Sequence, residues 1–74
     1  MVENGKHAKF RQLAEKRVTN ALKALQLVGN LSNRNNYSYE PEEVSKIISA
    51  LESELKAVKS KFQNSKFQKR NFKL

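Results

Sequence analysis

The chain has 74 residues, no cysteine, one histidine and a formal net charge of +8. A chain this short forms one domain at most and buries only about 60% of the surface that its unfolded form exposes. The composition excludes disulfides, cysteine-based zinc sites and histidine-rich metal sites, so extra stability has to come from oligomerisation or from docking on a partner.

A first helix is expected over residues 6–28, after a short flexible tail of residues 1–5. Apolar residues recur there in steps of three and four, which places them on one helix face. Gly29 and Asn30 follow, and these residue types are typical of a helix end in the left-handed conformation. The apolar face consists of Phe10, Leu13, Ala14, Val18, Ala21, Leu22, Leu25 and Val28.

Residues 29–40 are expected to form a loop, since residues 30–40 include four Asn and two Ser. These side chains bond to nearby backbone groups and so favour turns. The loop is longer than most connections between helices. Its polar side chains, that of Arg34 among them, either cap the helices or contact a ligand.

A second helix is expected over residues 41–63. Pro41 is favoured at the first helical position, and Glu42 and Glu43 lie in the positive field of the helix N-terminus. The apolar residues that follow are spaced by four and three, which is a heptad pattern. They are Val44, Ile48, Leu51, Leu55, Val58 and Phe62, with Ile47 beside them.

The apolar arc of the second helix is about 100° wide, which suits one packing partner, whereas that of the first helix is about 180° wide. The fold expected is all-α, an antiparallel two-helix hairpin that forms a four-helix arrangement as a homodimer, with the first helix near the dimer axis. A heterologous partner on the same face is the alternative.

Arg17 lies within the apolar arc of the first helix. A buried arginine is costly unless it is paired. We expect a bridge to Glu52, Glu54 or a tyrosine of the loop. The alternative is that Arg17 binds an anion in a groove.

The sequence predicts no enzyme, cofactor, metal or small-molecule substrate. No Ser or Thr is expected to have His7 as its base. Glu42 and Glu43 fit the start of a helix and not an acid–base pair. Glu52 and Glu54 diverge on a helix and so cannot bind one metal ion together. The first residues contain no secretory signal, and no segment approaches the roughly 20 apolar residues that span a bilayer. We therefore expect a cytoplasmic protein.

Positive charge is concentrated at both ends of the sequence: residues 1–34 carry +5, residues 35–60 carry −2 and residues 61–74 carry +5. Residues 64–74 are expected to form a basic C-terminal tail. Such a balance favours nucleic acid as a partner, bound mainly through its phosphates. The expected phosphate contacts are Lys61, Lys66, Lys69, Arg70 and Lys73, with Arg34 and the ridge Lys9, Lys16 and Lys23 secondary.

The form of nucleic acid stays open. Phe62, Phe67 and Phe72 are interleaved with the cations, but a spacing of five does not stay on one helical face. They either stack on bases or pack on the chain or on a partner. The alternative function is a protein–protein adaptor or inhibitor that docks a helical face on a larger acidic partner. Binding to an anionic membrane is expected to be weak.

Overall fold

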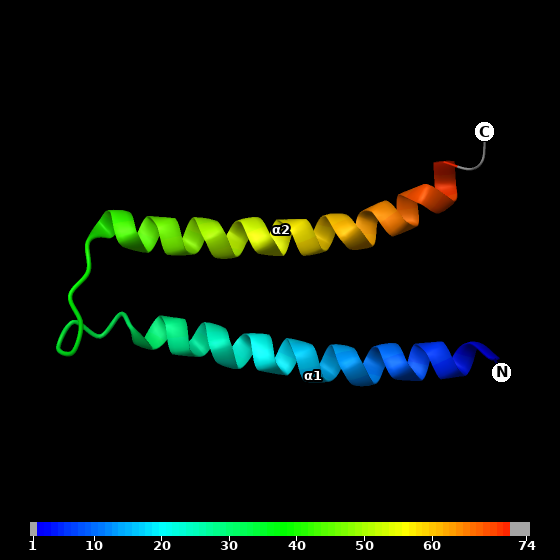
Figure 1. The fold of residues 1–74 in the computed structure, drawn as a ribbon, viewed down its shortest axis with the longest axis horizontal. Helices are drawn as coiled ribbons and strands as arrows, with labels where there is room; N and C mark the ends of the chain where they lie inside the picture. The colour runs from blue at the N-terminus through cyan, green and yellow to red at the C-terminus, as the bar shows by residue number, and fades with distance from the viewer. Residues whose placement is uncertain (1, 72–74) are drawn as a thin grey trace. The chain divides into compact units, whose positions relative to one another are not determined.

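The computed structural model consists of two α-helices, and the part of the chain that it describes contains no β-strand. It describes the backbone of residues 2–71 and the side chains of residues 5–64. Helix α1 is Val2–Asn30 and helix α2 is Pro41–Asn71, joined by residues 31–40 (Figure 1). The all-α class and the two helices expected from the periodicity are confirmed.

The chain divides into two units, residues 1–38 with α1 and residues 39–74 with α2. Among the side chains that the structure describes, none is fully buried, and only Ala14, Val28 and Tyr39 are half-buried. The exposed fraction of the large apolar residues ranges from 37%, at Leu13, to 68%, at Leu55. One helix cannot bury its own apolar face, so each face needs a second element to cover it.

The end of α1 differs from the expected left-handed turn. No glycine or other residue in the described range has a positive φ, so the prediction for Gly29 and Asn30 is wrong. The backbone instead tightens: the amides of Leu31, Ser32 and Asn33 donate to the carbonyl oxygens three residues earlier, at 3.0, 3.0 and 3.4 Å. Such tight turns satisfy the last carbonyl groups of a helix without a left-handed residue.

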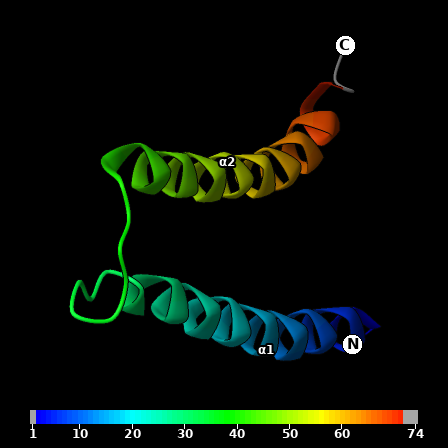
Figure 2. The same cartoon turned by 60° about the vertical axis from the view of Figure 1, so that its left-hand side comes forward.

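Asn33 organises the connecting segment, which folds into a tight loop (Figure 2). Its side-chain Oδ1 accepts a hydrogen bond from the amide of Asn35 at 2.9 Å. Its carbonyl oxygen accepts from the amides of Asn36 and Tyr37 at 3.1 and 3.0 Å. A side chain that bonds the backbone two residues on is the mechanism by which asparagine favours turns.

Helix α2 begins as expected at Pro41, and the residue before it acts as the cap. The carbonyl oxygen of Glu40 accepts from the amides of Glu43 and Val44 at 3.0 and 3.3 Å. The Glu43 carboxylate Oε1 in turn accepts from the Glu40 amide at 2.8 Å. This return bond from the third helical residue is one half of a capping box.

Both helices extend beyond the ranges expected from the sequence. Helix α1 begins at Val2 rather than near residue 6, and α2 continues to Asn71 rather than ending near residue 63. Residues 64–71 contain no glycine or proline and include lysine, glutamine and arginine, which are good helix formers. Much of the basic C-terminal segment is therefore helical. No helix within the described range is long and apolar enough to cross a membrane.

Candidate nucleic-acid interface

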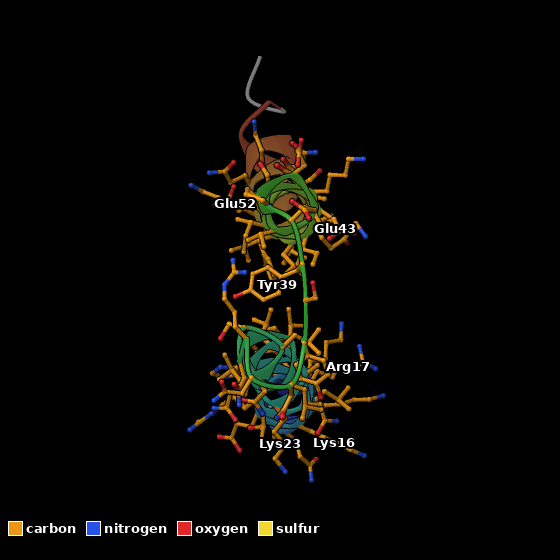
Figure 3. All side chains as sticks on the ribbon, turned by 90° about the vertical axis from the view of Figure 1, so that its left-hand side faces the viewer. Lys16, Arg17, Lys23, Tyr39, Glu43 and Glu52 are labelled. Carbon is orange, nitrogen blue, oxygen red and sulfur yellow. The ribbon has the colours of Figure 1, made fainter. Side chains whose placement is uncertain are left out.

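Lys9, Lys16 and Lys23 form a basic ridge on α1. They are seven residues apart, so each is about 10.5 Å along the axis from the next and only about 20° away around it. All three are exposed. Figure 3 shows α1 nearly end-on, with Lys16 and Lys23 on the same side of the helix. The unbroken helix from Val2 to Asn30 thus holds the three cations in one line.

Helix α2 carries the second group of predicted contacts at its C-terminal end. Lys61 is exposed, and the backbone of α2 continues through Lys66, Lys69 and Arg70, whose side chains lie outside the described set. Lys73 lies outside the described residues altogether. Cations near a helix C-terminus interact favourably with the negative end of the helix dipole.

The continuation of α2 gives two of these bases a definite register. Lys66 and Lys69 follow Phe62 by four and seven residues, which turn the helix by about 400° and 700° and so return within about 40° of the direction of Phe62. On a continuous helix these backbone positions therefore lie on the same line as that face. The backbone of α2 therefore places basic positions directly after the end of its apolar face. A separate tail over residues 64–74 would have no such register with that face.

Arg34 and Arg17 belong to neither group. Arg34 is exposed in the connecting segment, within the turns that Asn33 forms. Arg17 is exposed on α1 and projects from a different side from Lys16 and Lys23 (Figure 3). Its expected bridge to Glu52 or Glu54 would join the two units and stays a prediction.

The acidic residues of α2 do not gather into one acidic ridge. Glu43 and Glu52 project from opposite sides of the helix (Figure 3), and Glu43 is occupied by the cap at Glu40. In the described range, no three His, Asp or Glu side chains come together in a group able to hold a metal ion.

Structure and sequence together thus yield two basic groups in two different units: the ridge on α1, and the C-terminal end of α2. Exposed lysines of this kind neutralise phosphates and carry no base-specific readout of their own. No known family model matches the sequence, and no curated protein or solved structure shows significant similarity to it. The candidate interface therefore rests on the residues of this chain.

Proposed function

We propose that this protein is a small non-enzymatic nucleic-acid-binding accessory or regulatory protein of the cytoplasm. It acts through phosphate contacts from the basic end of α2, with Arg34 and the ridge on α1 as secondary contacts. The two helices pack as an antiparallel hairpin and the hairpin dimerises.

The observation that supports this function is the placement of the charge. Of the net charge of +8, residues 1–34 and residues 61–74 each contribute +5 and the stretch between them −2. The first group includes three cations in one line on α1, and most of the second is carried by the helical end of α2. Helical cations keep fixed spacings, which suits the regular charge of a phosphate backbone.

Dimerisation is supported by the apolar surface. The face of α1 is too wide for one neighbouring helix, and its large side chains are exposed. A hairpin supplies α1 with one neighbour, so a second copy is the simplest way to cover the rest.

The function is tested by fluorescence anisotropy with duplex DNA, single-stranded DNA and RNA of matched length at 50 and 200 mM salt. The basic-end variant replaces Lys66, Lys69, Arg70 and Lys73 by Gln. The control replaces Lys46, Lys56 and Lys59, the lysines of α2 outside the predicted contacts, also by Gln. Affinity should fall with salt, and for duplex DNA the loss of four cations in the basic-end variant should reduce the magnitude of the negative slope of log K against log salt by about 3.6. No binding at 50 mM salt would exclude this function.

A second function is favoured by a different observation, the exposure of apolar residues on both helices. Leu27 is 66% exposed and Phe62 is 62% exposed. Such side chains can anchor an adaptor or inhibitor on a larger acidic protein. Apolar docking loses little affinity as salt rises, so pull-downs at 50 and 500 mM salt separate this function from phosphate binding.

A further inference from the structure

We propose that α1 carries a dimer face, made of Phe10, Leu13, Arg17, Asn20, Ala24 and Leu27, on which a second copy of this chain docks in antiparallel orientation. The proposal extends the dimer of the proposed function to a surface, a register and a consequence for anion binding.

The dimer face is a heptad stripe distinct from the rest of the apolar arc. Its members are spaced by three and four residues and fall within an arc of about 100°. All six side chains are exposed, with Phe10 at 54% and Leu27 at 66%. Leu27 was absent from the apolar face expected from the sequence, because it lies beyond the edge of that arc. The helix is continuous under all of them and the face is about 25 Å long.

The face is self-complementary when two copies run antiparallel. Its spacing reads the same in both directions about a point between residues 18 and 19. A two-fold axis there sets Phe10 against the partner's Leu27 and Leu13 against the partner's Ala24. The small Ala24 faces the larger Leu13, which allows close packing in that layer, and Phe10 and Leu27 form a large apolar layer at each end.

The central layer gives Arg17, a cation in an otherwise apolar arc, a partner that replaces the bridge to Glu52 or Glu54 expected from the sequence. It sets Arg17 against the partner's Asn20, and the guanidinium donates where the amide oxygen accepts. This pairing of charge with dipole offsets the cost of covering Arg17. In a parallel dimer Arg17 would face the partner's Arg17, and the like charges would repel. One polar layer in an apolar seam is a known device for fixing register and orientation.

The basic ridge borders this face. Lys9, Lys16 and Lys23 each precede a member of the face by one residue. In an antiparallel pair these edges lie on the same side, so Lys16 approaches the partner's Lys23 and six lysines line one edge. Their repulsion opposes the dimer at low salt, and a polyanion that binds along the edge relieves it. This last step rests on the proposed nucleic-acid function.

The register is tested by disulfide crosslinking in the full chain, which has no cysteine of its own. Leu13→Cys and Ala24→Cys are prepared separately, with tags of different mass, and oxidised alone and mixed. The mixture should form the crosslinked heterodimer in large excess over either homodimer. An excess of homodimers would show a parallel pair, and monomers alone would show no such face; either result overturns the proposal. Gln12→Cys and Gln26→Cys, at exposed positions off the face, are the matched pair and should form no crosslinked dimer.

Sedimentation equilibrium provides the second measurement. Leu13→Glu should abolish the dimer, while Gln12→Glu should preserve it. Because Leu13 is already exposed in the single chain, the glutamate should act on the dimer and not on the fold of α1. The association constant of the unmodified protein should rise about fivefold between 50 and 500 mM salt as repulsion between the ridges is screened. Dimerisation that survives Leu13→Glu overturns the proposal.

The two proposals can fail separately. A monomeric Leu13→Glu that still binds nucleic acid leaves the function standing and gives a smaller salt slope, because each complex then holds one ridge. Crosslinking in the expected register without nucleic-acid binding leaves the dimer face standing and removes the function.

Discussion

Gly29 lies in the last turn of α1 without the positive φ for which glycine is usually needed at a helix end. A β-carbon built there meets no atom within 4 Å. The glycine therefore only adds backbone freedom to the unfolded chain.

Gly29→Ala should accordingly raise the free energy of unfolding by about 0.5–1 kcal/mol. The measurement is urea denaturation followed by circular dichroism at 222 nm. A loss of stability would mean that α1 ends in a left-handed residue after all.

Glu43 has a different role from its neighbour Glu42, although both lie in the first turn of α2. The Glu43 carboxylate closes the cap at Glu40, whereas Glu42 has no part in that bond. Glu43→Ala should cost about 0.5–1 kcal/mol of stability, and Glu42→Ala, which loses only the dipole interaction, about half as much. Equal losses in paired thermal melts would show that the return bond contributes nothing.

At the scale of the helix, the heptad stripe of α2 should lie against α1 in the hairpin. Leu51 is near the centre of that stripe and is 37% exposed. Leu51→Ala should therefore lower the free energy of unfolding by about 2 kcal/mol, the low end of the range for a covered leucine. Ser53→Ala, on the opposite side of α2, is the control and should change little. If both variants melt alike, the stripe is not covered and the hairpin is excluded.

The helices and their faces could be predicted from the sequence because a period of 3.6 residues is repeated along each one. Pro41 fixed the start of α2 for an equally local reason, its restricted φ. The ends of the helices were harder to predict. Glycine at position 29 is compatible with a left-handed turn and with a tight helical one, and lysine, glutamine and arginine beyond position 63 favour a helix without marking its end.

The candidate interface was predictable to a similar extent. The spacing of Lys9, Lys16 and Lys23 defines a ridge as soon as the segment is helical. The register of Lys66 and Lys69 with the apolar face was missed because the helix was expected to end before them. Periodicity shows which way a helix face points but carries no information on what covers it. The dimer face therefore follows from the symmetric spacing of its six residues and not from periodicity alone.

For the whole molecule, stability and association should be coupled. The described side chains include none that is fully buried, and a folded form that covers little apolar surface is only marginally stable. The midpoint of thermal unfolding should therefore rise with protein concentration, because the dimer adds stability to the folded monomer. Melts from 5 to 500 μM test this, and a constant midpoint would indicate that the monomer is self-sufficient.

The connecting segment has a practical consequence, because it holds Arg34. Among the described residues, Arg34 is the one lysine or arginine outside the helices. Proteases cut exposed loops in preference to helices, so trypsin should cleave the protein first at the peptide bond after Arg34. The products, residues 1–34 and 35–74, each keep one helix and carry +5 and +3. A single nick thus turns the protein into a split pair whose reassembly, on mixing the two peptides, reports directly on how strongly the helices attract each other.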